Sequence, residues 1–559
     1  MWNWISVAVG AILAVAAAPG PPEDALKTFQ ATLRGIEARE AAWWKGLPDA
    51  EEKAHAEFHR PLRQQYAEKV HEPRPDFAPI RGLYGEALAF ETERETAYRL
   101  LATSGHAKAL STLWKEVLAA FDLEARAERD NAPGELQRVL FLLRQGPSIR
   151  LHVLEFRRRA LAQAIAVVPG ATEFLGGPDA WKEARARDLA ARSNSRRVFT
   201  VDALATLPDG AGRGRLVSLL MDEAPEVRIA ALEGLGHGGD GPPFAAAPLL
   251  ADPVPAVVFS VLEVLRANPP ADPAWIEPLA RTYIEGGGRR RADALRGLRS
   301  VTGRATTDDP AAWKAWLAET RSAREAGTFR RPETPADAES VTTPGPGDQA
   351  RFWGIPVESD RVLLAADGWY TLVVPADHSF QAGRHVTDWI TGQRGWRKER
   401  ESVRDVIVRL LPPFLEGLPP GATFRILLLG SAKNMAGEVT WFDERGPLPP
   451  TPPNRRRAKA FLEDFHIGSS EFFQQGLQIL LDTEEPDTAV FVTGGYLRTD
   501  RFLLPEALLA EFRRRNRFRR LRLHIVHVMD QGPESTRVLK EIAEAAGGTL
   551  VRALAPPPR

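Results

Sequence analysis

The sequence predicts a multidomain protein in which an all-α N-terminal region and an α-solenoid of helical repeats precede a doubly wound α/β domain. Apolar residues recur at helical spacing in the first part of the chain, and a leucine-rich pattern repeats at a fixed period in the middle. Strand-like apolar runs alternate with helical segments in the last part. The expected parts are an N-terminal segment, a helical region, a solenoid with a tryptophan-containing cap, a linker and the α/β domain, at residues 1–18, 23–135, 136–320, 321–350 and 351–555.

The composition limits the possible functions. The 559 residues include 73 basic and 73 acidic ones, so the formal net charge is zero and no general attraction draws the chain to nucleic acid. Cysteine is absent, which excludes disulfides, thiolate metal sites and a cysteine nucleophile. The Gly-x-Ser-x-Gly pattern of hydrolases and the Walker A phosphate loop are also missing. We therefore expect a protein that is not an enzyme and that uses no cofactor.

The N-terminus carries a short apolar segment. Residues Ile5–Ala18 read ISVAVGAILAVAAA and end in small residues of the kind found at signal-peptide cleavage sites. Fourteen residues suit a signal peptide better than a membrane-spanning helix. We expect an exported, periplasmic or envelope-associated protein. The alternatives are an uncleaved anchor, which would be the one membrane contact of the chain, and a misassigned start.

The region 23–135 shows helical periodicity but no identifiable chemistry. Leu26, Phe29, Leu33 and Ile36 follow the spacing of one buried helical stripe. We expect packed helices here.

The middle of the chain contains internal repeats. The turn at Asp222 recurs at Asp252, a spacing of 252 − 222 = 30 residues, and the leucines that follow each turn keep the same period. Each unit is a helix, an Asp/Pro turn and a second helix, and neither helix can bury its apolar face except against a neighbouring unit. The first copy resembles the HEAT-repeat family, with the motif positions occupied by Asp222, Pro225, Val227 and Arg228. The resemblance implies either a concave protein-binding surface or a spacer.

A capping helix and a linker are expected after the repeats. Asp309 suits the N-cap position and Pro310 the first helical position. Trp313 and Trp316 are three residues apart, so both can close the open end of the stack. Residues 321–350 then have the polar, Pro- and Gly-containing composition of a linker.

The last part of the chain opens with an apolar run, Arg361–Ala366, followed by Asp367 and Gly368. This pattern is typical of a strand buried on both faces of a parallel sheet, and ligands bind past the carboxyl ends of such strands. Further strands are expected at 423–430, 438–442, 489–493, 520–528 and 549–551, and helices at 397–415, 455–465, 471–481, 504–515 and 534–546. The order supports a Rossmann-like sheet with helices on both faces. We expect the basic run Arg513–Arg520 to be a solvated helix face.

The sequence around Asp367 resembles the opening of a von Willebrand factor A domain. That family places Asp-x-Ser-x-Ser after its first strand, and the resemblance implies a magnesium site completed by a loop threonine and a second acid. Asp367 matches the first acid, and Trp369 and Thr371 stand at the serine positions. The remaining positions correspond to Ser469 or Ser470 for the loop threonine and to Gly494 for the second acid.

This metal site is degenerate, because Trp369 offers no oxygen and Gly494 no carboxylate. A single formal negative charge would remain to offset the dehydration of Mg²⁺, so we expect no bound metal. Residues 373–396 are interpreted as an insertion over the sheet, from which Asp377 or Ser379 could repair the site. In an alternative alignment, Asp377-His378-Ser379 is itself the motif.

We therefore expect a non-enzymatic scaffold protein of the bacterial cell envelope that binds protein partners. Its binding surfaces would be the solenoid and the rim of the sheet, where Trp369 and Tyr370 could serve as an apolar anchor. An alternative is a magnesium-dependent sensor or enzyme that uses Asp367 and residues of the insertion. A further alternative is an architectural envelope component without a discrete ligand.

Overall fold

The computed structural model describes most of the helices and strands of the chain. The described residues are 22–58, 78–130, 146–191, 193–236, 242–270, 272–303, 309–329, 351–352, 355–356, 369–375, 408, 411–412, 414–416, 418, 421–431, 438–443, 445–463, 473–483, 487–493, 505–527 and 533–552. The chain divides into two compact units, Met1–Leu216 and Val217–Arg559. The division falls inside the segment 136–320 that the sequence groups as one solenoid.

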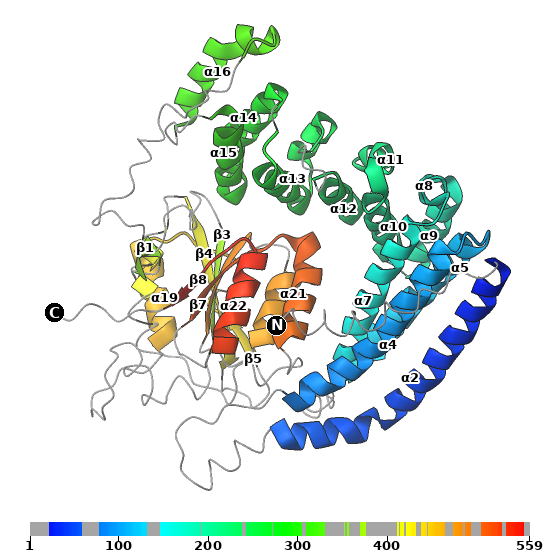
Figure 1. The fold of residues 1–559 in the computed structure, drawn as a ribbon. Coiled ribbons are helices and arrows are strands. Elements are labelled where there is room, and N and C mark those ends of the chain that lie inside the picture. Colours follow the sequence, from blue (N-terminus) through cyan, green and yellow to red (C-terminus); the bar gives the residue numbers. More distant parts are fainter. Residues whose placement is uncertain are drawn as a thin grey trace. The chain divides into compact units, whose positions relative to one another are not determined.

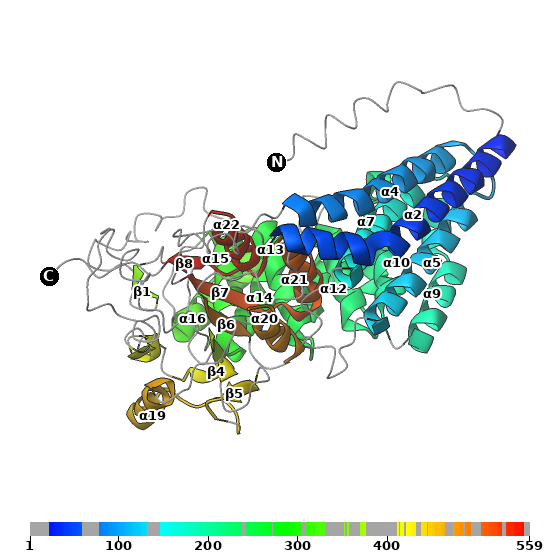
Figure 2. The same cartoon turned by 90° about the horizontal axis from the view of Figure 1, so that it is seen from below.

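The first unit is built from helices. Four long ones are α2 (Pro22–Phe58), α4 (Ala78–Thr103), α5 (Ala109–Asp130) and α7 (Gly146–Ala166). Helices α2, α4 and α7 lie alongside one another (Figure 2), and α5 packs on α7. Shorter elements follow: α8 (Ala171–Gly176), α9 (Pro178–Ala191), α10 (Ser195–Ala205), η2 (Pro208–Gly210) and α11 (Arg213–Leu219). The predicted stripe is confirmed at Phe29, Leu33 and Ile36, which are buried, while Leu26 is half-buried.

A buried ionic cluster joins three of these helices. Arg157 of α7 binds Glu91 of α4 through Nη2 at 2.5 Å and Nε at 2.9 Å, and Arg94 of α4 binds the same carboxylate at 2.7 Å. Both guanidinium groups also reach Glu40 of α2. Burial opposes the charged form of Glu40, but Arg94 and Arg157 outweigh it and hold its pKa below the usual range. Because each carboxylate serves two arginines, the cluster specifies how the three helices cross.

The second unit begins with the repeat helices, which are α12 (Pro225–Gly236), η3 (Phe244–Ala251), α13 (Pro255–Ala267), η4 (Pro273–Trp275), α14 (Ile276–Glu285) and α15 (Gly288–Thr302). The period of the sequence is visible in the turns. Asp222 Oδ1 accepts a hydrogen bond from Ala224 N at 2.9 Å, and Asp252 Oδ1 accepts one from Val254 N at 2.9 Å. Arg228 Nη2 donates to Asp252 Oδ1 at 2.9 Å and so links the two turns.

The predicted capping helix is α16 (Pro310–Glu325). Asp309 is its N-cap and accepts hydrogen bonds from the backbone of residues 311 and 312 at 2.9 and 3.2 Å, with Pro310 in the first turn. The rings of Trp313 and Trp316 are buried with their centroids 5.4 Å apart, and Trp313 also contacts Tyr283 of α14. The predicted N-cap is confirmed, whereas the burial of the two tryptophans does not by itself test whether they close a helix stack.

The C-terminal part is a parallel α/β sheet with flanking helices (Figure 1). Its six strands lie in the order β5-β4-β3-β6-β7-β8, and among them only β5 is antiparallel to its neighbour. The strands are β3 (Trp369–Pro375), β4 (Thr423–Ser431), β5 (Glu438–Trp441), β6 (Thr488–Thr493), β7 (Arg522–His527) and β8 (Leu550–Arg552). A separate antiparallel pair consists of β1 (Arg351–Phe352) and β2 (Ile355–Pro356).

The helices of this part are α19 (Pro452–Glu463), α20 (Phe473–Asp482), α21 (Pro505–Arg519) and α22 (Pro533–Ala545). Strands β6 and β7 are buried along their whole length, although β7 carries Arg522, His524 and His527 among its apolar residues. Helix α20 approaches the sheet closely at Gly476, where an added Cβ would come within 2.5 Å of Leu429 and 2.7 Å of Phe491. No described helix combines the length and the apolar character that a membrane span requires.

The position of β3 corrects part of the sequence interpretation. Trp369 and Thr371, expected beyond the carboxyl end of the first strand, lie within β3, and Thr371 is buried between Arg425 of β4 and Ala489 of β6. Residues 373–375, assigned to an insertion, complete this strand. The apolar run that pairs with both neighbours is therefore the one after Gly368. The run expected as the strand, 361–366, lies outside the described residues.

Candidate functional site

Three acidic side chains form a ladder across the repeat helices. Glu233 lies on α12, Glu263 on α13 and Asp293 on α15. Their spacing is 263 − 233 = 30 and 293 − 263 = 30 residues, which is the period of the repeat. The three acids therefore occupy equivalent positions in successive units. We call Glu233, Glu263 and Asp293 the acidic ladder.

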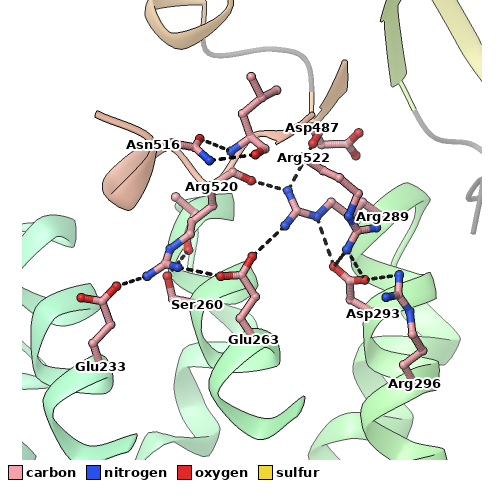
Figure 3. Close-up of polar contacts among 12 residues, drawn as sticks. Glu233, Ser260, Glu263, Arg289, Asp293, Arg296, Asp487, Asn516, Arg520 and Arg522 are labelled. Atoms are coloured by element: carbon pink, nitrogen blue, oxygen red, sulfur yellow. Dashed lines mark hydrogen bonds and ion pairs between the residues drawn. The ribbon is translucent and has the colours of Figure 1, made fainter. Parts of the chain in front are cut away.

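Three arginines of the α/β part bind this ladder, and Figure 3 shows two of them, Arg520 and Arg522. Arg517 lies in the last turn of α21, Arg520 in the connection that follows, and Arg522 at the start of β7; we call these three residues the arginine strip. Arg517 Nε donates to Glu233 at 2.7 Å, and Arg520 binds both Glu233 and Glu263, the latter at 2.6 Å. Arg522 Nη2 donates to both carboxylate oxygens of Asp293, at 2.8 and 3.0 Å. Every acid of the ladder is thus matched by the strip.

Arg289, at the start of α15, ties the two surfaces together. Its side chain is only 1% exposed and lies 4.1 Å from the ring centroid of Phe259. It donates to Glu263 at 3.0 Å and to Asp293 at 3.1 Å. It also donates to the backbone carbonyls of Asp487, at 3.2 Å, and of Arg520. Because these carbonyls precede β6 and β7, Arg289 holds the amino ends of two adjacent strands.

The connection between α21 and β7 is unusual at Arg520. This residue adopts the left-handed conformation, with φ of 55°, where glycine is the common choice at a helix end. Asn516 supports the turn, because its side chain accepts from Leu521 N at 2.8 Å and donates to Leu521 O at 3.0 Å. An arginine at this position costs roughly 1–2 kcal/mol of backbone strain. Its side chain offsets that cost by binding two acids of the ladder.

The interface has a dry end and a wet end. The dry end consists of Arg289, Asp293 and Arg522, all buried. Burial there opposes charge on Asp293, but Arg522, Arg289 and Arg296 outweigh it and hold the pKa of Asp293 far below its usual range. The wet end consists of Glu233, Glu263, Arg517 and Arg520, whose side chains are 16–29% exposed beside a polar hollow of about 190 Å³. Solvent ions therefore reach one end more readily than the other.

These contacts involve the ends at which the parallel strands begin, which we call the amino edge of the sheet; the ends at which they finish form its carboxyl edge. Asp487 immediately precedes β6, Arg520 lies in the connection that leads into β7, and Arg522 is the first residue of β7. Strands β3, β4, β6, β7 and β8 run parallel, so their amino ends share this edge. Their carboxyl ends, where ligands of α/β sheets bind, lie at the opposite edge.

The residues that the sequence singled out for the metal motif are only partly described. Asp367, Asp377, Ser379, Ser469, Ser470 and Gly494 lie outside the described residues. Trp369 and Thr371 belong to the first half of β3, towards the amino edge, and so do not stand at the carboxyl rim. Thr493, which precedes Gly494, is the buried last residue of β6. Within the described part of the chain, no group of three or more His, Cys, Asp or Glu residues is arranged to hold a metal ion.

The ionic interface was missed at the sequence level, although a signal for it exists. Extending the 30-residue period from leucines to charged positions finds Glu233, Glu263 and Asp293. The basic run Arg513–Arg520 was expected to be solvated, and this expectation is wrong for several of its members. Besides Arg517 and Arg520, which bind the acidic ladder, Arg519 Nε donates to the carbonyl of Thr483 at 2.9 Å, so these side chains are held by protein partners.

No protein-family model matches the chain, and no curated protein matches it either.

Proposed function

We propose that this protein is a non-enzymatic, protein-binding scaffold in which HEAT-like repeats support an A-like domain. The observation that carries the proposal is the ionic interface. It engages the amino edge of the sheet and leaves the carboxyl edge, the usual ligand edge of such sheets, outside these contacts. Each unit of the repeats contributes one acid to this support.

The strand order supports a ligand site between β3 and β6. The order β5-β4-β3-β6-β7-β8 reverses direction there, and ligands of doubly wound sheets bind at such a switch point. In the sequence, Asp377 and Ser379 follow the end of β3, and Gly494 follows the end of β6. This supports the alignment in which Asp377-His378-Ser379 is the A-domain motif, in place of the one that starts at Asp367.

The donor set at this edge fits a magnesium ion poorly. Asp377 and Ser379 provide one carboxylate and one hydroxyl, but Gln381 stands where the second serine would be. The second acid is replaced by Gly494. One formal negative charge offsets only a small part of the free-energy cost of removing water from Mg²⁺. Direct contact with a partner protein is therefore the proposed mode of binding, without a cofactor.

The location that we propose is the bacterial cell envelope. Its support is the apolar segment Ile5–Ala18, which has the length of a signal-peptide core. The cysteine-free sequence needs no particular redox environment.

Site-specific photo-crosslinking in cells that produce the protein tests this function. A photoreactive amino acid at position 379, which follows β3 in the sequence, tests the proposed binding edge, and one at Glu544, an exposed position on α22, is the matched control. We expect a discrete protein adduct from position 379 that is absent from position 544. The same adducts from both positions, or no protein adduct from 379, would contradict the proposal.

A second candidate is a magnesium-dependent sensor or enzyme, and the end of β3 at Pro375 favours it because Asp377 then follows the strand closely. A ligand that binds only the folded state stabilises it, by about 2.7 kcal/mol at a hundred times its Kd. Thermal melting with and without Mg²⁺ therefore distinguishes the candidates. A rise in Tm that Asp377→Ala abolishes and Asp367→Ala preserves would favour the metal-dependent protein over the metal-free scaffold.

A further inference from the structure

A groove lies between two elements of the repeat region that do not carry the acidic ladder. It has a volume of about 450 Å³ and is lined by residues of η3 and α14, together with Arg290 of α15. This volume is within the range of about 300–1,000 Å³ that is usual for binding sites. We call it the η3–α14 groove.

The groove follows from the sequence of η3, Phe244-Ala-Ala-Ala-Pro-Leu-Leu-Ala251. This element is a 3₁₀ helix, in which side chains three residues apart align, so Phe244, Ala247 and Leu250 form one apolar stripe. The alanines leave space beside α14. Phe244 is 46% exposed, yet its ring is held in place by an edge contact with Trp275, whose centroid is 5.8 Å away. The groove thus presents a positioned aromatic ring.

The charges of the groove favour an acidic ligand. Of its two glutamates, Glu277 is already paired with Arg324 at 3.0 Å. Arg281 is exposed and has no ion pair within the described part of the chain. Arg290 donates to Leu250 O at 2.7 Å, while its Nε is shielded from solvent and has no acceptor among the described residues. The lining therefore holds two arginines and, besides the paired Glu277, one further carboxylate, that of Glu285.

We propose that the η3–α14 groove binds a protein segment in which a bulky apolar side chain is closely followed by an acidic one. The apolar side chain packs on Phe244 and the alanines, and the carboxylate pairs with Arg281 and Arg290. This inference rests on the proposed protein-binding function and assigns it a second surface. That surface is independent of the carboxyl edge of the sheet.

Selection from a library of random displayed peptides on the full-length protein tests the inference. We expect enrichment of peptides with an aromatic or large aliphatic residue followed within a few positions by Asp or Glu. The binding of a synthetic copy, measured by fluorescence anisotropy, should weaken at least ~10-fold in Phe244→Ala and, independently, in Ala245→Trp, which fills the groove from an exposed position. Arg281→Glu should weaken binding of the acidic peptide and strengthen binding of a version in which lysine replaces the acidic residue.

Met221→Ala is the control, because Met221 is 62% exposed and does not line the groove. It should bind the peptide as tightly as the unmodified protein. Failure to enrich any peptide, enrichment without the acid, or unchanged binding in both groove variants would overturn the inference. If the selected peptides bind elsewhere on the protein, the proposed scaffold function stands and only the assignment of the groove as a binding site is overturned. A missing crosslink at position 379 would instead contradict the function proposed for the carboxyl edge, and peptide binding would still report on the groove separately.

Discussion

The substitution Arg289→Met tests whether the dry end of the interface stabilises the second unit. Methionine keeps an apolar chain against Phe259 but removes every donor. Glu263 retains Arg520, and Asp293 retains Arg522 and Arg296, so neither carboxylate is left alone. The carbonyl of Asp487 keeps a hydrogen bond from Arg522 N at 3.0 Å. The carbonyl of Arg520 loses its contact with Arg289.

These losses set the expected magnitude. A buried ion pair that is broken so as to leave a lone charge costs about 3–5 kcal/mol. Here the charges stay paired, and the main deficits are one carbonyl without its donor, at about 1–3 kcal/mol, and two charge-assisted hydrogen bonds. The variant no longer has to bury a guanidinium group, and the desolvation cost that is avoided offsets part of this loss of stability. We expect the free energy of unfolding to fall by about 2–3 kcal/mol, and Tm by roughly 5–10 °C.

Calorimetry and urea unfolding of the full-length protein measure both quantities. The control is Lys540→Met, which removes a charge from a pair whose side chains are 61% and 55% exposed, and which should cost at most about 0.5 kcal/mol. If Arg289→Met proved no more destabilising than this control, the interface would contribute nothing to stability, and the assigned role of Arg289 would be wrong.

Three further predictions concern the interface and the cap. Raising the ionic strength to 1 M shortens the Debye length to about 3 Å, so it should weaken the ion pairs of the wet end and lower the free energy of unfolding. In urea titrations, Glu233→Gln should show a smaller salt dependence, because that carboxylate is then absent. Folding lowers the pKa of Asp293, so the charged Asp293 stabilises the folded state above its unfolded pKa of about 3.9, and this stabilisation is lost as the pH falls towards the folded value. The free energy of unfolding should therefore fall less steeply with decreasing pH in Asp293→Asn than in the unmodified protein. Equal slopes would refute the ion pairing. Trp313→Ala should cost about 3–5 kcal/mol in urea unfolding, because its ring is 1% exposed at the end of the helix stack, and a loss below about 1 kcal/mol would show that the stack needs no cap.

Features that depend on neighbouring residues were predictable from the sequence. Asp309 caps α16 and Pro310 follows it because both act within one helical turn. Phe29, Leu33 and Ile36 are buried because their spacing matches one helix face. The alternation of strands and helices likewise predicted the parallel sheet.

Features that depend on distant partners were not predictable in the same way. Two apolar runs flank Asp367 and Gly368, and both have the pattern of a buried strand. Pairing with β4 and β6 selects the second run, and that choice is not local. Arg517 binds Glu233 across 284 residues, so its helix end alone could not identify the partner. Element η3 is a 3₁₀ helix that contains Pro248, and its apolar pattern alone does not distinguish a 3₁₀ helix from an α-helix.

The equal spacing of the three ladder acids constrains how this protein can evolve. Arrays of similar units commonly gain or lose a copy, since each copy contacts only its neighbours. Here a duplicated unit between α12 and α13 would separate Glu233 from Arg517 and Arg520, while Glu263 and Asp293 kept their partners. The length of the array is therefore matched to a fixed distance on the folded α/β part, and a change in copy number would have to be accompanied by new cations on α21.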